Sequence, residues 1–450
     1  VGMLSGCGDS TETPATTDNQ ETTEETTEET TEEEAPAVEV VEDGGGKVLN
    51  IYAWNEDIVK QLEEQMGMKD NKIGDVTVNV VVNAQADNVF TDKLTEALTS
   101  QDSAADDDKV DLVLLDAGFA KRYTTAAADL LYTMPEIGIT EDDMADIYDS
   151  SKRLTTDENG QVRALGFQAT GCAVYYRKDY AKEALGTDDP AEVQELMSSW
   201  DGLKDVAAKL GDKGYYLIDN PIDLEYIYVN PDNTEIGADG KISLTPGFDS
   251  WLDYTKELCD AGYVKRPAGK YWEDDWYASA AKDGKVFMYS GPGWFLNGCL
   301  SGWAGEDQNG NWGAVVGPQA YWWGGTFFGV AKGSDNTGLC KEIIDTIIIN
   351  PDGGVKQYDI DGSFPTNKKA AETLMANGGA NDFLGGQNIL EVYNDANAAI
   401  GDYTVGPYDV SALEACFGIW GDFFSGKIDK DTVVSNWQDE MIKMYPNLSK

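Results

Sequence analysis

Strand-like and helix-like segments alternate after an N-terminal tail, and this alternation most limits the folds open to the chain. Residues 47–54 alternate apolar with polar side chains and are rich in Val, Ile and Tyr, which predicts a strand; 76–82 and 110–116 predict two more. Apolar residues four apart predict helices over 58–66 and 90–98. The order strand, helix, strand, helix, strand predicts an α/β fold with a doubly wound parallel sheet.

Composition excludes several classes of function. The 450 residues include no histidine, so there is no Ser-His or Cys-His nucleophile pair, no imidazole base and no His-ligated metal. Acidic residues outnumber basic ones by 81 to 33, which would repel phosphates and excludes nucleic-acid binding. The length predicts two lobes or more, and no apolar run reaches the roughly 18 residues of a membrane helix.

Neither the cysteines nor the acidic turns predict a metal or cofactor. Three turns, 157–161, 307–311 and 359–363, superficially resemble calcium loops but lack the complete ligand frame with its Glu. Apart from Cys7, the cysteines are widely spaced without a C-x-x-C pair, so we expect mostly buried thiols and leave one disulfide open. These cysteines are Cys172, Cys259, Cys299, Cys340 and Cys416.

The N-terminal segment predicts an export signal followed by a membrane tether. Leu4-Ser5-Gly6-Cys7 resembles the bacterial lipobox, in which the signal peptide is cut before a cysteine that then receives lipid. Residues 8–46 are rich in Thr and Glu and contain no Lys or Arg, a composition typical of disorder. We therefore expect residues 1–6 to be a signal remnant. Residues 7–46 would be a lipidated tether on the outer face of the bacterial membrane.

Seven segments downstream of the tail carry recognisable motifs. The most specific is GKVFMYSGPGWF (284–295), which contains a Gly-Pro-x-Trp turn. The others are LNIYAWNED (49–57), DLVLLDAG (111–118), GFQATGCAVYYRKDY (166–180), WWGGTFFGVAKGSDN (322–336), DGSFPTNKKA (361–370) and FFSGKIDKDTVVSNWQDEM (423–441). In this order along residues 47–450, the segments resemble those of extracellular solute-binding proteins of the oligosaccharide, maltose-binding-protein-like family.

The resemblance implies a periplasmic-binding-protein-like fold: two doubly wound lobes that close over a ligand cleft. It implies a monomer that captures an oligosaccharide and delivers it to the permease subunits of an ABC importer, with no catalytic residues. Hinge segments are expected near 166–174, 325–331 and 361–368. The expected ranges are 47–168 and 328–362 for the first lobe and 172–325 and 366–450 for the second.

Candidate ligand contacts follow from the chemistry of sugars, whose apolar faces suit flat rings and whose hydroxyls suit polar groups. Trp294 follows a Gly-Pro-Gly turn that can present its ring to a cleft. Trp272 and Trp276 would share a helix face, with at least one in the core and Trp276 the better cleft candidate. The full set of predicted contacts is Trp54, Asn55, Asp87, Asn88, Asp116, Gln168, Trp276, Trp294, Trp323 and Gly324.

Structural roles compete with some of these assignments. Trp54 could instead pack on its own helix, and Asn88 suits a helix N-cap. Only one of the neighbours Trp322 and Trp323 should face the cleft, because adjacent strand side chains point in opposite directions. Trp420 is expected in the core.

Three other functions fit parts of the sequence. A polyamine-binding protein of similar fold would explain the acidity and the aromatic residues. A cell-surface glycoside hydrolase needs only a pair of carboxylates, and an adhesin would use the tail as a stalk.

Overall fold

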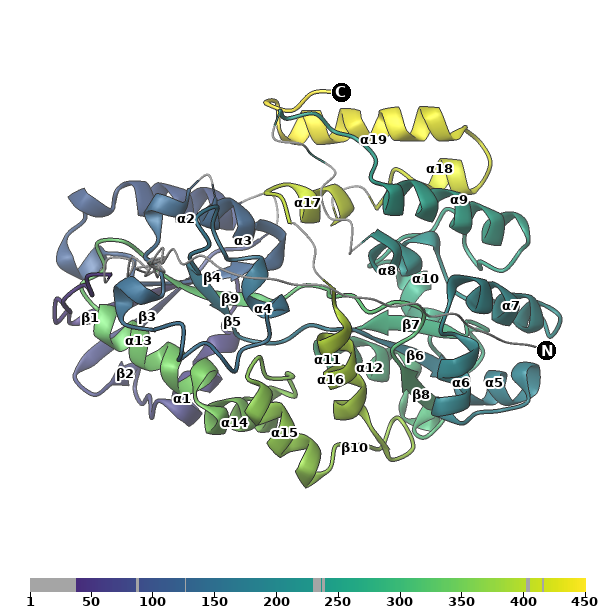
Figure 1. Cartoon of the computed structure of the whole chain (residues 1–450), viewed down its shortest axis with the longest axis horizontal. Helices are drawn as coiled ribbons and strands as arrows, with labels where there is room; N and C mark the ends of the chain where they lie inside the picture. Colours follow the sequence, from purple (N-terminus) through teal and green to yellow (C-terminus); the bar gives the residue numbers. More distant parts are fainter. Residues whose placement is uncertain are drawn as a thin grey trace, which may run out of the picture. The chain divides into compact units, whose positions relative to one another are not determined.

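The strand and helix order predicted for the first segments is confirmed. β1 (Val48–Ala53) pairs in parallel with β3 (Val76–Val82) on one side and with β4 (Leu112–Asp116) on the other. Helices α1 (Asp57–Gln65) and α2 (Val89–Thr99) connect these strands. The parallel pairing places the carboxyl ends of β1, β3 and β4 at one edge of the sheet (Figure 1).

The computed structural model describes residues 38–85, 89–125, 127–229, 236, 239–401, 405–414 and 417–450. Residues Glu39–Lys450 form one unit, to which this account applies. Within the described residues, no helix combines the length and apolar character needed to cross a membrane. These residues also contain no group of three or more Cys, Asp or Glu side chains arranged to hold a metal ion.

The first sheet is mixed rather than wholly parallel. Its strand order is β2-β3-β1-β4-β9-β5, with β2 at Lys72–Ile73. β9 (Thr326–Val330) lies antiparallel between β4 and β5 (Ala164–Gly166), with Asp116 opposite Thr326. The chain enters β9 at the edge where β4 ends, so β9 must run in the opposite direction. A late segment therefore completes a sheet begun more than 200 residues earlier, and in Figure 1 green β9 lies beside blue β4.

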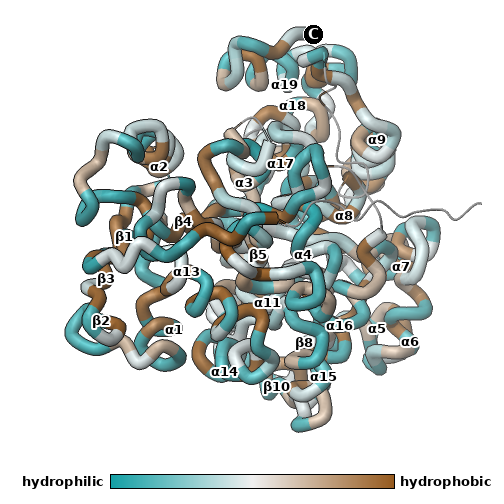
Figure 2. The backbone as a smooth tube through the Cα atoms, turned by 60° about the vertical axis from the view of Figure 1, so that its left-hand side comes forward, coloured by the Kyte–Doolittle hydropathy of each residue, from teal (hydrophilic) through white to brown (hydrophobic). Residues whose placement is uncertain are grey.

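Alternating side chains of β4 fill both faces of this sheet. Leu112 and Leu114 pack into a core with α1 and α13 (Thr337–Ile344), whereas Val113 and Leu115 pack into another with α2 and α3 (Ala117–Thr124). All four are at most 4% exposed, and each stabilises the fold by about 1.5–3 kcal/mol. Apolar stretches colour the tube brown along these central strands in Figure 2, which agrees with the prediction of a sheet covered on both sides.

A second sheet lies in the other half of the unit. β6 (Ala173–Arg177) is flanked antiparallel by β7 (Met288–Gly291) and β8 (Trp312–Val315). Single parallel bridges, Tyr216 to Val286 and Ile218 to Val264, continue the pairing beyond β7. The named strands of this sheet are therefore antiparallel, and parallel pairing occurs only at these two bridges among the described residues.

Helices surround the second sheet and share one large core with it. Trp420 is 1% exposed and packs on Phe248, Trp251 and Trp437, so its predicted core position is confirmed. The helices here are α5 (Lys178–Leu185), α6 (Pro190–Leu196), α7 (Trp200–Gly211), α8 (Glu225–Val229), α9 (Pro246–Asp260), α10 (Asp274–Ala278), α11 (Gly293–Phe295), α12 (Ser301–Ala304), α15 (Lys368–Asn377), α16 (Ile389–Ala399), α17 (Asp409–Glu414), α18 (Gly421–Phe424) and α19 (Lys430–Met444). Helix α4 (Ser150–Arg153) precedes β5, helix α14 (Pro351–Asp361) follows α13, and a small hairpin joins β10 (Ala380–Asn381) to β11 (Gln387–Asn388).

The four described cysteines are free thiols whose acidity is set by burial. Cys172, Cys259 and Cys340 are buried free thiols and Cys299 is half-buried, and burial raises the pKa of all four. Cys7 and Cys416 lie outside the described residues.

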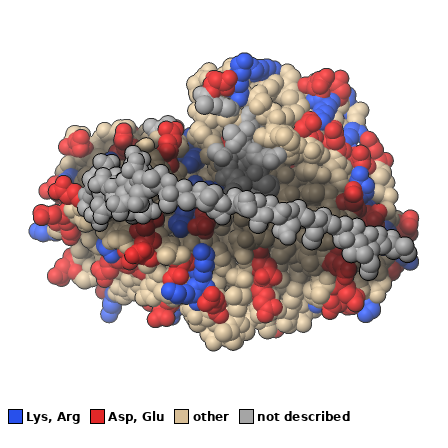
Figure 3. Space-filling model, in the orientation of Figure 1, with Lys and Arg blue, Asp and Glu red and all other residues tan. Residues whose placement is uncertain are grey.

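Asp and Glu side chains are spread over the face seen in Figure 3 instead of gathering in one patch.

The turn before β5 is held by a buried ion pair. Asp157 accepts hydrogen bonds from the backbone N–H groups of Asn159 and Gln161, which makes an Asx turn. Its other oxygen lies 2.7 Å from Arg163 Nε, and the side chains of Asp157 and Arg163 are only 4% and 10% exposed. Arg163 Nη1 also donates to the carbonyls of Ala128 and Leu131. The pair thereby fixes the start of the strand that leads to Gln168.

Asp157→Ala should lower the free energy of unfolding by about 3–5 kcal/mol, because it leaves the Arg163 charge buried without a partner. Asp149→Ala is the matched control, since the Asp149 side chain is 78% exposed in its ion pair with Lys152 and its loss should cost less than about 1 kcal/mol. Urea unfolding of the two variants measures the difference. Equal losses would contradict a structural role for the buried pair.

Candidate ligand-binding site

A cleft of about 690 Å³ opens at the carboxyl ends of β1 and β4, where ligands of such sheets bind. Residues from the first sheet and from the α11 region of the second half line it together. Of the ten predicted contacts, the cleft lining includes Trp54, Asn55, Asp116, Gln168, Trp294 and Gly324. Asp87 and Asn88 lie outside the described residues.

Trp54 occupies the end of β1, and its ring serves as both a cleft wall and a packed side chain. The ring meets Phe90 and Phe119 edge-on at centroid distances of 5.7 and 6.0 Å. The side chain is only half-buried, so one part of the ring remains at the cleft. Trp54 therefore lines the cleft and also packs on Phe90 of α2 and Phe119 of α3.

The first turn of α1 supplies polar groups next to Trp54. Asn55 donates from Nδ2 to Asp57 Oδ2 at 2.8 Å and accepts from the Asp57 N–H at 3.1 Å. Glu56, Asp57 and Lys60 also line the cleft. Local hydrogen bonds thus orient Asn55 and Asp57 before any ligand binds, which reduces the entropy that binding must overcome.

Trp294 stands on the opposite wall, at the start of α11. Its ring is half-buried and meets the Trp323 ring at 4.9 Å. Gly324 faces it so closely that a Cβ there would lie 3.6 Å from the indole. Gly324 and Gly325 have φ values of 71° and 124°, which side chains rarely adopt. The predicted Gly-Gly strand therefore provides a turn that passes directly beside the Trp294 ring.

Two predicted contacts are wrong in position. Trp276 is fully buried: its Nε1 donates to Asp223 at 3.1 Å and its ring stacks on Tyr271. Trp323 is 4% exposed and supports Trp294 from behind without lining the cleft. Trp322 is also buried, at 7% exposed, so neither neighbour presents its ring as expected. Trp322 and Trp323 were expected to point in opposite directions because adjacent side chains alternate along an extended strand. A left-handed turn at Gly324 starts directly after them, so the extended strand is not formed there.

Asp116 ends β4 and caps α3. Its Oδ1 accepts the Gly118 N–H at 2.8 Å. Desolvation raises the pKa of Asp116 to about 6, although hydrogen bonds from Gly118 and from the Gln85 side chain oppose the shift. Asp116 therefore caps α3 and also lines the cleft.

The third crossing between the halves adds polar groups that the sequence did not single out as contacts. Asp361, at the end of α14, accepts from Gln61 Nε2 at 2.9 Å and from the Ser363 N–H at 2.8 Å. Asp361 and Ser363 line the cleft, as does Asn297 of a π-helical turn, η8 (Leu296–Leu300). A signal existed for Asp361, because it flanks the expected hinge at 361–368. No sequence pattern marked Lys60 or Asn297.

Comparison with known protein families agrees with this arrangement. A model of the bacterial extracellular solute-binding protein family matches residues 57–381. The chain therefore belongs to that family of extracellular solute-binding transport proteins. A search of curated proteins gave no match.

Solved structures share the fold at low sequence identity. An extracellular solute-binding protein of family 1 has a TM-score of 0.76 and 18% identity, covering 88% of this chain and 99% of the other. A B. animalis subsp. lactis ABC-transporter-associated binding protein, solved with β-1,6-galactobiose, has a TM-score of 0.62 and 20% identity, with 89% and 97% covered. The sugar-binding protein MalE of Xanthomonas citri has a TM-score of 0.66 and 16% identity, with 88% and 97% covered.

Asp116→Asn should stabilise the protein at neutral pH and change it little near pH 4. A folded-state pKa of about 6 lies above the roughly 3.9 of an unfolded Asp. Ionisation therefore costs stability as the pH rises from about 4 to 6, and the cost persists above pH 6. Asn removes this cost and can still accept the Gly118 N–H. Melting temperatures measured from pH 4 to 8 test this, and a constant difference between variant and wild type would contradict it.

Proposed function

We propose that this protein captures an oligosaccharide in the cleft and delivers it to the permease subunits of an ABC importer. The indoles of Trp54 and Trp294, which line one cleft together with carboxylates and amides, carry the proposal. Flat rings suit the apolar faces of sugars, and Asn55, Asp116 and Gln168 suit their hydroxyls. Neighbours of the same fold that are solved with sugars support this ligand class.

Capture would proceed by closure of two lobes. We propose that residues 47–168 and 328–362 form the first lobe and that 172–325 and 366–450 form the second. Hinge bending near 166–174, 325–331 and 361–368 would bring Trp294 toward Trp54. The protein needs no catalytic residue for this task and would act as a monomer.

Attachment to the outer face of the membrane completes the proposal. Cys7, in Leu4-Ser5-Gly6-Cys7, would carry the lipid, and the Thr/Glu-rich segment 8–46 would serve as a tether. Cys7→Ser should release the protein from the membrane fraction into the medium in a bacterial host that processes lipoproteins. Continued membrane association of this variant would overturn the anchor.

A polyamine is the second candidate ligand, favoured by the charge of the cleft. Glu56, Asp57, Asp116 and Asp361 line it, and Lys60 is the only basic residue among the lining side chains that the structure describes. A cationic ligand would bind less tightly as salt rises, because screening weakens charge attraction. A neutral oligosaccharide would show little salt dependence.

A thermal-shift screen of residues 47–450 against oligosaccharides and polyamines tests the proposal. A ligand that binds only the folded protein raises the melting temperature by mass action. A response to one glycan class supports sugar capture. A salt-sensitive response to spermidine alone would transfer the function to polyamines, and product formation from a bound glycan would favour a hydrolase.

Trp294→Ala should weaken binding of the responding glycan at least about tenfold, since one stacked ring contributes roughly 1–1.5 kcal/mol and its buried area adds more. Its half-buried position predicts only a small loss of stability. Trp200→Ala is the matched control: Trp200 is half-buried, stacks on Tyr228 at 3.8 Å and does not line the cleft. Calorimetric titration measures both variants. Unchanged affinity with a large drop in melting temperature would assign Trp294 to the core.

A further inference from the structure

Trp272 combines exposure with backbone strain. Its side chain is 48% exposed, and it is the one aromatic residue among the exposed large hydrophobic residues of the described chain. Its φ of 65° lies in the left-handed region, which is a genuine outlier for so bulky a residue. Strain of this kind persists where the surrounding structure enforces it, and it gathers at functional positions. The strain offsets part of what the ring contributes through its edge-on contact with Trp276 at 5.4 Å, and the exposed part of the ring is available for another role.

Trp272 belongs to the wall that carries Trp294. Its ring lies 6.0 Å from Trp323, whose other contacts include Trp294 at 4.9 Å. The two partly exposed indoles, Trp272 and Trp294, therefore share one buried indole and are no farther apart than the sum of those distances. Half-buried Trp303 lies 6.5 Å from Trp272. Together Trp272 and Trp303 extend the aromatic wall beyond the residues that line the cleft, and we call them the outer aromatic surface.

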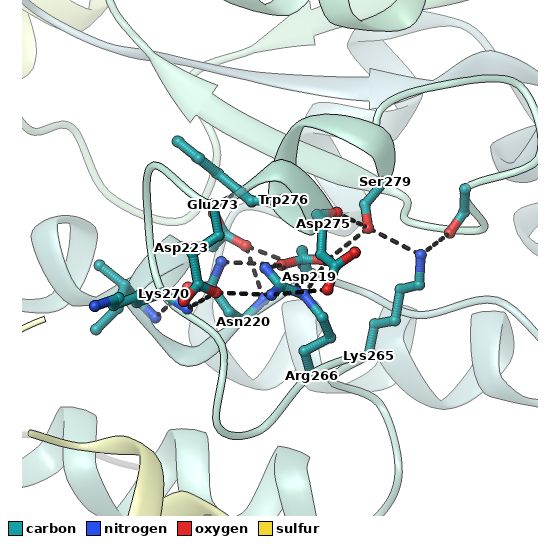
Figure 4. A network of polar contacts seen from close by, with 12 residues as sticks. Asp219, Asn220, Asp223, Lys265, Arg266, Lys270, Glu273, Asp275, Trp276 and Ser279 are labelled. Carbon is teal, nitrogen blue, oxygen red and sulfur yellow. Dashed lines mark hydrogen bonds and ion pairs between the residues drawn. The ribbon is translucent and has the colours of Figure 1, made fainter. Parts of the chain in front are cut away.

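A polar network fixes the loop that presents Trp272. Figure 4 shows Arg266 between two carboxylates. Arg266 Nη2 lies 2.5 Å from Oδ2 of fully buried Asp219, and Nη1 donates to Glu273 at 2.8 Å. Glu273 also accepts the Lys270 N–H at 3.3 Å. Lys270 and Glu273, on either side of Trp272, are thus connected through Arg266 to the buried Asp219.

A second chain of contacts supports the same anchor. Lys265 Nζ donates to Ser279 Oγ at 2.8 Å, and Ser279 Oγ donates to Asp219 Oδ1 at 2.6 Å (Figure 4). Asp219 therefore receives hydrogen bonds from both Arg266 and Ser279. This rigid base can hold the neighbouring left-handed residue in place, as a preorganised binding residue requires.

We propose that Trp272 forms an outer subsite, on which the part of a longer oligosaccharide that extends beyond the cleft stacks. The inference rests on the proposed sugar-binding function and adds to it a preference for longer oligosaccharide chains. The shared contact with Trp323 makes Trp272 continuous with the Trp294 wall. The exposed carboxylates of Asp274 and Asp275 come two and three residues after Trp272 in the chain and can accept sugar hydroxyls. Arg266 and Glu273 act as positioning residues.

Trp272→Gly separates the role of the ring from the stability of the fold. Glycine adopts the same φ without strain, so the melting temperature should hold or rise. Affinity for a hexasaccharide of the glycan that responds in the thermal-shift screen should fall about three- to tenfold, the worth of one aromatic contact. Affinity for the disaccharide of the same glycan should change less than about twofold. Calorimetric titration of both ligands gives the comparison.

Two further variants serve as controls. Lys285→Gly relieves the other non-glycine residue of the second half that the structure describes with a left-handed backbone, φ 60°, and should leave both affinities unchanged. Trp272→Phe keeps an aromatic face and should recover part of the hexasaccharide affinity.

Several outcomes would overturn the outer subsite. Equal losses for both ligands in Trp272→Gly would indicate a distorted cleft, and no loss for either would leave the ring without a ligand role. A marked drop in melting temperature with unchanged affinities would assign Trp272 to packing. Failure of the proposed function itself is visible beforehand, because the wild-type protein would then bind neither glycan.

Discussion

The backbone pairing of β9 between β4 and β5 is the constraint on which the rest of the structure depends. It joins Leu112–Asp116, Ala164–Gly166 and Thr326–Val330 in one sheet, although two of these segments lie more than 150 residues apart. Because β9 runs antiparallel to β4, its first residue lies opposite Asp116, and Gly324 and Gly325 come directly before it. The cleft lies where β9 begins, so strand pairing in the first sheet positions Gly324 beside Trp294, which belongs to the second half.

The sequence predicts the cleft well where residue position follows from strand periodicity. Trp54 and Asp116 come directly after apolar strands, and parallel strands bring their carboxyl ends together. Trp294 could be found because its Gly-Pro-Gly turn resembles a family motif. These residues line the cleft. By contrast, Lys60 and Asn297 reach it through the packing of helices on sheets, and no local pattern encodes that geometry.

The tryptophans were harder to assign because their orientation depends on where a helix begins. Trp272 and Trp276 were expected to share a helix face, with Trp276 toward the cleft. The helix begins only at Asp274, and the left-handed turn at Trp272 leaves its ring partly exposed and edge-on against the buried Trp276 ring at 5.4 Å. Trp276 becomes core and Trp272 exposed, the reverse of the expectation. One backbone dihedral, which neither hydrophobicity nor spacing specifies, decides between them.

Strand β9 also constrains how the protein can be made. The first sheet lacks its penultimate strand until residue 330 has been synthesised, by which time the whole of the second sheet is available. Since chains fold progressively as they leave the ribosome, the second half can acquire its sheet while the first still waits for its own. Until then β4 and β5 present unpaired edges, which are sites of aggregation. For an exported chain, this order favours passage across the membrane before folding, because the sheet nearest the N-terminus is among the last parts to be completed.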